Sequence, residues 1–202
     1  MSSLAPIDSD ASLADRILRH ASRLFAERGW AATSLREIAE AAGCTKPALY
    51  YHWGNKEALF TACIRSETDA LTALIADHVE DEVGDVSVAT RLVGGLRDFF
   101  AHLERSPTGM RLVTRAELRP EPNQPVFDFA SLRDKHHEYI RTLLARGVRR
   151  GELRGDVDLD DMAHALSGMI DQRLQLWLHG EPLDHDLPER IVHLFLHGVG
   201  TP

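Results

Sequence analysis

Hydrogen-bond donors of four chemical kinds are concentrated between residues 45 and 56 of the 202-residue chain. Hydroxyl, ammonium, phenol and imidazole groups can all donate to phosphate oxygens. Two slim residues of the same segment, Pro47 and Ala48, let the backbone sit deep in a DNA groove and can touch thymine methyl groups. The pattern therefore favours contact with duplex DNA. The donors are Thr45, Lys46, Tyr50, Tyr51, His52 and Lys56.

Two short helices joined by a turn would position these side chains. Ser34 and Glu37 have the spacing of a capping box, so they predict a helix that begins there and is broken by Gly43. Thr45 can then cap a second short helix over residues 46–52. Two such helices with a glycine in the turn are what a DNA-binding helix-turn-helix requires. An ordinary helical hairpin whose aromatic residues only pack is the alternative.

Helical periodicity also dominates the remainder of the chain, and no run of alternating β-branched residues predicts a strand. The fold class is therefore predicted to be all-α. The first helix is expected over residues 12–28, with Gly29 as its C-terminal stop, and a long helix over residues 56–79. Further helices are expected at residues 86–104, 107–118, 126–149, 159–179 and 188–198.

The formal net charge of −8 is unevenly distributed. Residues 12–56 hold seven Lys or Arg against four acidic residues, a local charge of +3, whereas residues 57–202 hold 16 basic and 25 acidic residues, a charge of −9. An acidic body keeps a protein off random polyanions, while a locally basic face can still approach phosphates. The charge pattern thus agrees with DNA contact near the N-terminus.

Several classes of protein are disfavoured. The two cysteines are too few for a disulfide framework or a cysteine-rich zinc site. Apolar runs are too short to span a membrane, and no secretory signal precedes them, which predicts a cytoplasmic protein. His193 and His197 have the spacing of two metal ligands on one helix face but lack a third ligand nearby. We therefore expect no metal, no cofactor and, without a phosphate loop, nucleophile elbow or paired carboxylates, no enzyme.

Residues 33–59, read as TSLREIAEAAGCTKPALYYHWGNKEAL, resemble the DNA-binding signature of TetR-type repressors. The resemblance extends over about 45 residues, from Ala14 to Leu59. It implies that the first helix supports the other two, that the second contacts the DNA backbone and that the third is the recognition helix. The polar residue often found at the place of Ala48 is absent here, so only apolar contact with a base is expected at that point.

The resemblance also implies a role for individual residues. The residues implied to contact phosphates are Thr33 or Ser34, Tyr50, His52 and Lys56. The residues implied to face the bases are Arg36, Lys46, Pro47 and Ala48. The resulting DNA-binding set is Thr33, Ser34, Arg36, Thr45, Lys46, Pro47, Ala48, Tyr50, Tyr51, His52 and Lys56.

Three parts of the chain follow from these observations: a tail at residues 1–11, a DNA-binding domain at 12–56 and a helical body at 57–202. The resemblance to TetR-type repressors implies that the body binds a small effector between its helices. It also implies that two chains dimerise through the last two long helices of the body. The expected effector residues are Phe99, Phe100, Leu103, Met110, Val113, Phe127, Met162, Leu166, Met169 and Arg173. The expected dimer residues are Met162, Ile170, Leu174, Trp177, Ile191, Leu194 and Phe195.

The sequence therefore predicts a homodimeric repressor that binds an inverted-repeat operator and is released by a small apolar effector. Helices that are apolar on more than one face, as in residues 159–179, favour a partner chain, although the core of a monomer would also bury them. An activator on the same module is an open alternative, as is a helical enzyme or carrier with a similar hairpin.

Overall fold

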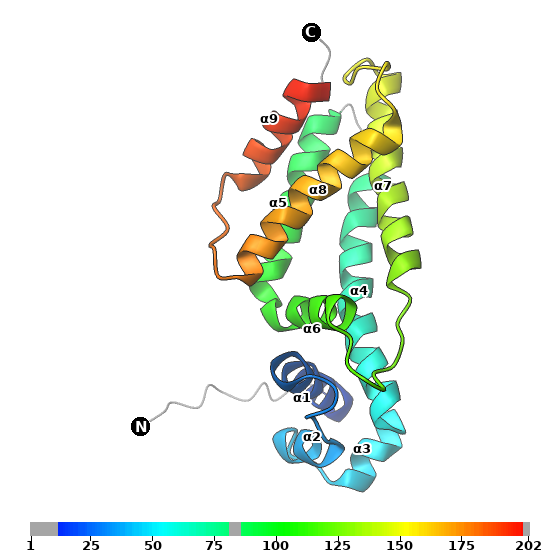
Figure 1. Ribbon diagram of the computed structural model, residues 1–202, viewed down its shortest axis with the longest axis vertical. Helices are drawn as coiled ribbons and strands as arrows, with labels where there is room; N and C mark the ends of the chain where they lie inside the picture. The colour runs from blue at the N-terminus through cyan, green and yellow to red at the C-terminus, as the bar shows by residue number, and fades with distance from the viewer. Residues whose placement is uncertain (1–11, 81–85, 200–202) are drawn as a thin grey trace. The chain divides into compact units, whose positions relative to one another are not determined.

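The computed structural model describes residues 12–80 and 86–199, and every regular element within these ranges is a helix (Figure 1). This confirms the all-α prediction. The described helices are α1 (Leu13–Arg28), α2 (Leu35–Ala41), α3 (Lys46–Trp53), α4 (Lys56–Glu80), α5 (Val88–Arg105), α6 (Pro107–Leu118), α7 (Phe129–Arg149), α8 (Leu159–Leu178) and α9 (Leu187–Val199). None of these described helices is long and apolar enough to span a lipid bilayer.

The start of α7 differs most from its predicted position at residue 126. The helix begins at Phe129 because the carboxylate of Asp128 accepts a hydrogen bond from the backbone amide of Ser131 at 3.0 Å and caps the first turn. The three prolines before it, at positions 120, 122 and 125, belong to the preceding connection. A capping carboxylate thus sets the boundary, where periodicity alone had extended the helix.

The helices form two units, each with its own core. The first unit contains residues 12–68 together with residues 108–127, and the second contains the rest of the described chain. The first unit therefore draws on two separate stretches of sequence. The sequence predicts a domain boundary at residue 56, near the end of the helix-turn-helix motif. In the structure the first unit also includes α4 up to residue 68 and most of α6.

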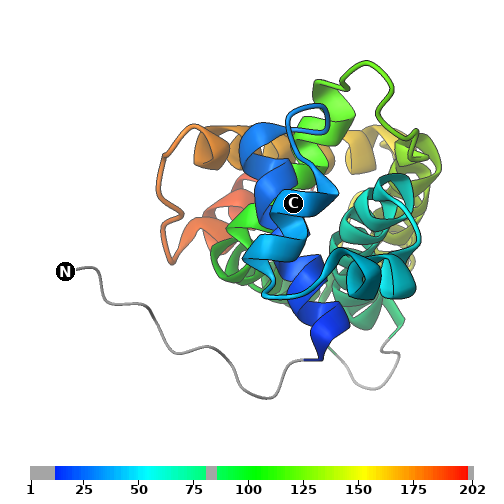
Figure 2. The same cartoon turned by 90° about the horizontal axis from the view of Figure 1, so that it is seen from below.

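The core of the first unit is built on the apolar face of α1. Ile17, Ala21, Leu24 and Phe25 are all buried, as their helical spacing predicts. The ring of Phe25 lies edge-on to that of Phe60 with centroids 5.0 Å apart, and the Trp30 ring lies 5.2 Å from Phe60. In Figure 2 the first three helices, coloured blue to light blue, lie together. Helices α1, α2 and α3 contact each other pairwise, which fixes the angle of α3.

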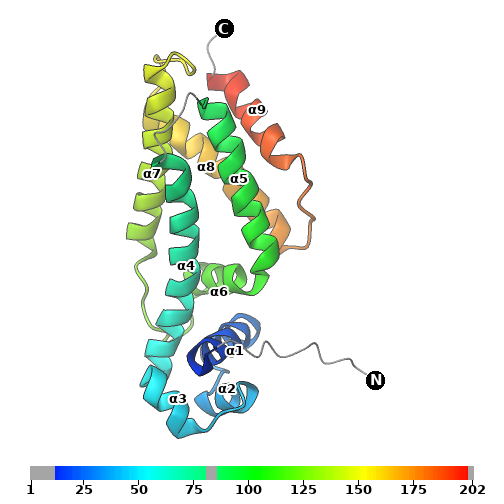
Figure 3. The same ribbon diagram turned by 180° about the vertical axis from the view of Figure 1, so that it is seen from behind.

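The second unit is a helical bundle in which α7 packs on α8, α5 on α9, α8 on α9 and α5 on α7 (Figure 3). Gly147 allows one close approach, since a Cβ at this position would lie 2.9 Å from the side chain of Leu153. Polar contacts also connect neighbouring helices: Arg97 on α5 pairs with Glu189 on α9, and Arg141 on α7 pairs with Asp160 on α8. The bundle is thus fixed by both apolar and ionic contacts.

Candidate nucleic-acid interface

Helix α3 is held in place by a cap at each end and one buried anchor. The hydroxyl of Thr45 accepts a hydrogen bond from the amide of Ala48 at 3.3 Å, which confirms the predicted N-cap. Leu49 is fully buried and fixes the helix on the core. Gly54 ends the helix with φ of 72°, a left-handed conformation that glycine adopts without strain. The backbone of α3 is therefore set before any ligand arrives.

The opposite face of α3 is turned outward. Tyr51 is 87% exposed and Tyr50 is 50% exposed, values that are high for aromatic side chains. The ring of Tyr51 packs edge-on against His52 with centroids 5.3 Å apart, and Lys46 is exposed at the start of the helix. The structure thus brings together on one short helix the donors predicted from the sequence, with Pro47 exposed beside them and Ala48 half-buried.

The start of α2 shows the predicted capping box. The Ser34 hydroxyl accepts from the Glu37 amide at 3.3 Å, and the Ser34 amide donates to the Glu37 carboxylate at 2.9 Å. These hydrogen bonds with Ser34, aided by the nearby Arg28, hold the pKa of the Glu37 carboxyl below its ordinary value. Thr33 differs: it is only 2% exposed, and its hydroxyl donates to the carbonyl of Gly29. Of the pair Thr33 or Ser34, only Ser34 is therefore exposed for a phosphate contact.

Arg36, expected to face the bases, lies on the exposed surface of α2. Its Nε donates to the carboxylate of Glu40 at 2.7 Å, one turn further along the helix. This hydrogen bond raises the pKa of Arg36 above its ordinary value. An exposed pair of this kind is weak, so the guanidinium can exchange Glu40 for another acceptor.

Lys56 has a position that the sequence did not predict. Its ammonium donates to the carbonyl of Trp30 at 2.5 Å and lies 4.2 Å from the centroid of the Trp30 ring. Partial burial lowers the pKa of Lys56, although three nearby carboxylates act in the opposite direction. The side chain thus connects the start of α4 to the loop after α1. Since an ammonium has three donors, a phosphate contact remains compatible with this arrangement.

Two residues far along the chain, Arg115 and Glu121, also bind the loop after α1, and we call this pair the clamp. The Glu121 carboxylate accepts from the amide of Ala31 at 2.8 Å and pairs with Arg115 at 2.9 Å. Arg115 also donates to the carbonyl of Arg28 at the end of α1. A Cβ on Gly29 would overlap both the Glu121 and the Arg115 side chains. Sequence reasoning missed this clamp because 90 residues separate Ala31 from Glu121, and no local pattern connects them.

The expected effector residues are divided between the two units. Met110, Val113 and Phe127 belong to the first unit, and the other seven belong to the second. Among these seven, Leu103, Met162 and Leu166 are fully buried, as plain core residues also are. The Nε of Arg173 is buried, and no hydrogen-bond partner for it is found in the described part of the chain. Their joint role in ligand binding stays a prediction.

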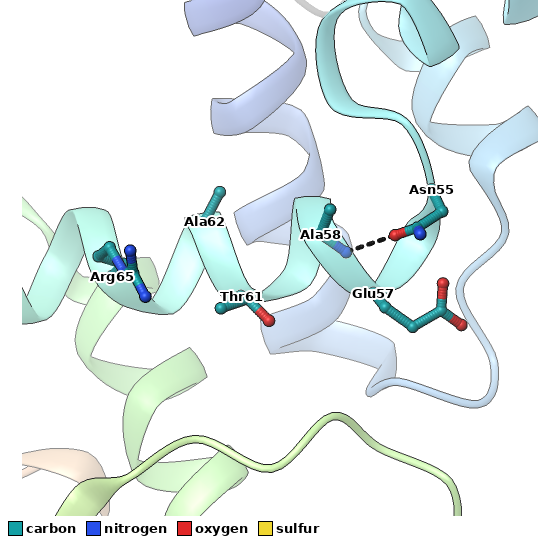
Figure 4. Close-up of a pocket in the computed structure, with 6 residues that line it drawn as sticks. All are labelled: Asn55, Glu57, Ala58, Thr61, Ala62 and Arg65. Carbon is teal, nitrogen blue, oxygen red and sulfur yellow. Dashed lines mark hydrogen bonds between the residues drawn. The ribbon is translucent and has the colours of Figure 1, made fainter.

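A separate hollow of about 450 Å³ lies on the first turns of α4 (Figure 4). It contains none of the expected effector residues. Asn55 at its edge accepts a hydrogen bond from the amide of Ala58 at 2.7 Å and so caps α4. The hollow is open and lined by short or charged side chains, a surface with little to enclose an apolar molecule. Its lining residues are Asn55, Glu57, Ala58, Thr61, Ala62 and Arg65.

The expected dimer residues fall into two groups. Met162, Ile191 and Phe195 are at most 5% exposed and contribute to the core of their own chain. Leu194 is 67% exposed, and three residues of α8 are partly exposed. Only this second group offers apolar surface to a partner. The partly exposed residues of α8 are Ile170, Leu174 and Trp177.

Comparison with known proteins agrees with this architecture. Residues 17–63 match the family model for bacterial regulatory proteins of the tetR family. Residues 87–195 match the family model for the tetracyclin repressor-like C-terminal domain. The transcriptional regulator TtgR of Pseudomonas putida is 31% identical over 175 residues, covering 81% of this chain and 79% of its own. The repressor AcnR of Corynebacterium glutamicum is 28% identical over 172 residues, covering 84% of each chain.

Solved structures show the same fold. The TetR-family regulator PfmR from Thermus thermophilus superposes with a TM-score of 0.70 at 26% identity, covering 90% of this chain and 95% of its own. The helix-turn-helix, the helical body and these likenesses define a DNA-binding transcriptional regulator and not an enzyme. The chain belongs to the TetR family. AcnR of Corynebacterium glutamicum and KstR2 of Mycolicibacterium smegmatis, two of the relatives, are named as repressors.

Proposed function

We propose that two copies of the chain bind an inverted-repeat operator through α3 and repress transcription until a small effector releases them. The observation that carries the proposal is the outward face of α3. Lys46, Tyr50, Tyr51 and His52 are exposed there on a helix whose backbone is fixed by Thr45 and Gly54. Side chains on such a rigid helix can enter a major groove without further folding.

A second copy of the chain would explain the apolar surface of the second unit. Leu194 on α9 and Trp177 on α8 belong to helices that contact each other within the chain. A two-fold axis through such a surface makes the contact self-complementary. Two recognition helices related by this axis would meet half-sites about one helical turn apart, or a multiple of it, which predicts the inverted repeat.

The effector is expected to be largely apolar with at least one hydrogen-bond acceptor. Phe99, Phe100 and Met169 supply apolar and adaptable side chains in the second unit. The buried Nε of Arg173 supplies a donor, and a buried donor left without a partner costs about 1 to 3 kcal/mol. An acceptor on the effector would satisfy it. Effector and operator must then oppose each other reciprocally, with a coupling of about 1 to 3 kcal/mol.

The experiment starts with selection of bound duplexes from a random-sequence DNA library by the full chain. An enriched inverted repeat, bound by two chains in light scattering, is the expected result; a single unrepeated site would contradict the symmetric arrangement. Apolar metabolites with and without a carboxylate are then screened by thermal shift, and each hit is titrated against the complex. A tight ligand that leaves operator affinity unchanged would remove the effector part of the proposal. A site that overlaps the polymerase-binding elements of a promoter or lies downstream of them favours repression, whereas one upstream of those elements favours activation.

A further inference from the structure

The outward face of α1 carries four basic side chains. Arg16, Arg19, His20 and Arg23 are spaced by three, one and three residues, so they fall on one side of the helix. Arg19 and Arg23 are exposed, and the other two are half-buried. We call these four residues the α1 basic face. None of them belongs to the helix-turn-helix contacts described above.

The charge of this face is not balanced by the protein. Within residues 12–80 and 86–199, no ion pair is formed by Arg16, Arg19 or Arg23, whereas Arg28 nearby pairs with Glu37 at 2.8 Å. Two acidic residues of α1 flank the face: Asp15, which lies 2.7 Å from the Ser12 hydroxyl at the helix start, and the exposed Glu27, one turn beyond Arg23. Since the three guanidiniums form no ion pair with these carboxylates and like charges one turn apart destabilise a helix slightly, the arrangement suits a polyanionic partner.

The imidazole of His20 lies among the arginines of this face. Its pKa is lowered by partial burial and by the repulsion of Arg23, Arg19 and Arg16. The Nη2 of Arg23 lies 3.4 Å from Nδ1 of the imidazole, so the basic groups are in direct contact. An anion placed here would relieve the repulsion among the three guanidiniums and would favour the protonated form of the imidazole.

Helix α1, which carries the α1 basic face, contacts α3 within the first unit. Arg16 is close enough to the Cys44 thiol to act against the rise in its pKa that burial causes. Cys44 belongs to the turn that leads directly to the cap of α3 at Thr45. From Arg16 to Arg23 the face extends along α1 by about 10 Å, the rise of about three base pairs. The α1 basic face therefore adds a basic surface about three base pairs long on a helix that contacts α3.

We propose that the α1 basic face binds phosphates of the DNA that flanks the base pairs contacted by α3. The inference rests on the DNA-binding function of the chain and adds a sequence-independent anchor to it. A lipid surface is a poorer partner, because membrane-binding helices combine basic residues with exposed apolar ones. Every fully exposed residue of α1 is charged.

The expected effect is large enough to measure. Each phosphate contact contributes about −0.9 to the slope of log affinity against log salt concentration. Three guanidiniums therefore account for a slope of about −2.7 per bound chain. Over a fourfold change in salt concentration, this corresponds to about a 40-fold change in affinity.

The test compares the full chain with the triple variant Arg16→Gln, Arg19→Gln, Arg23→Gln. Two duplexes serve as probes, one carrying a selected site with ten flanking base pairs on each side, the other cut at the edges of the site. A matched control, Arg149→Gln, Arg154→Gln, Arg190→Gln, changes the net charge equally in the second unit. A third variant replaces the three α1 arginines by lysine and keeps their charge.

On the flanked duplex, we expect the glutamine variant to lose about 2 to 3 units of slope per chain, while the control and lysine variants match the wild type. On the cut duplex, the difference between wild type and variant should largely vanish. Equal slopes for wild type and glutamine variant would overturn the proposal, and an equal loss on both duplexes would overturn its flanking position. If selection yields no site at all, the proposed operator fails, yet slopes on an unselected 40-base-pair duplex still decide whether the α1 basic face binds phosphates.

Discussion

Replacing Lys56 by methionine tests whether one ammonium both stabilises the DNA-binding unit and contacts DNA. Methionine keeps an unbranched stem of similar length but removes the charge. In the structure the ammonium donates to the Trp30 carbonyl at 2.5 Å and lies over the Trp30 ring. We therefore expect Lys56→Met to lower both the stability of the free protein and its affinity for DNA.

The stability loss follows from two contacts. A hydrogen bond from a charged donor contributes about 1.5 to 3 kcal/mol when well shielded, and a cation over an aromatic ring at an exposed site contributes about 0.5 to 1 kcal/mol. Because Lys56 is only half-buried, water replaces part of both contacts, and a total of about 1 to 2 kcal/mol is expected. For a chain of this size that corresponds to a fall in Tm of about 3 to 6 °C.

The assay combines thermal unfolding without DNA and binding to a selected duplex over a range of salt concentrations. Lys46→Met is the matched control, because Lys46 is exposed at the start of α3. Its loss should leave the Tm unchanged and should relax the preference for one base pair by about 1 to 3 kcal/mol. For Lys56→Met, the salt slope should also fall by about one unit per chain, equally on all sequences. An unchanged Tm would refute the structural part of this reasoning, and an unchanged slope would refute the phosphate contact.

Three further changes test the remaining contacts. Gly29→Ala should destabilise the protein by about 1 to 3 kcal/mol in chemical unfolding, since φ of 87° is strained for alanine and the new Cβ would overlap Glu121; a stable variant would show that the clamp yields easily. Hydrogen bonding from Ala31, with help from Arg115, holds the pKa of Glu121 below its ordinary value of 4.5, so its stabilisation is present above pH 4.5 and lost as the pH falls through the lowered pKa. Glu121→Gln should therefore be less stable than wild type at pH 7 and lose less stability in that acidic range; parallel curves of stability against pH would contradict this. Leu194→Asp should give a folded monomer by light scattering, whereas Phe195→Asp, at a side chain only 4% exposed, should unfold the chain; a dimeric Leu194→Asp protein would exclude α9 from the interface.

The parts of the fold that sequence predicted well are those fixed by neighbours along the chain. The capping box of Ser34 and Glu37, the cap at Thr45 and the glycine stop at Gly29 all involve residues at most four positions apart. Local hydrogen bonds and steric limits decide such features, so the pattern alone predicts them. The face of α3 follows in turn, because burial of Leu49 leaves the adjacent tyrosines outside.

The contacts that sequence could not predict join residues distant in the chain. Nothing in the pattern around Lys56 indicates that its ammonium is bound by the carbonyl of Trp30, 26 positions earlier. Thr33 has the same polar character as Ser34 but turns its hydroxyl inward to α1. Phe195 has the same apolar character as Leu194 but lies on the buried side of α9. Residue type predicts that a side chain can bind or pack; its neighbours in space decide where it does so.

Because of the clamp formed by Arg115 and Glu121, the helix-turn-helix motif is not expected to fold as an independent unit. The motif ends near residue 59, yet the loop between α1 and α2 is bound by residues 115 and 121, and the ring of Phe60 completes the core around Phe25. A fragment ending at residue 56 would expose that core and leave the amide of Ala31 without its carboxylate partner. The DNA-binding unit therefore depends on residues 108–127, which the chain places between two stretches of the second unit. Any effector that moves these residues must also alter the support of α1, and with it the frame on which α3 is held.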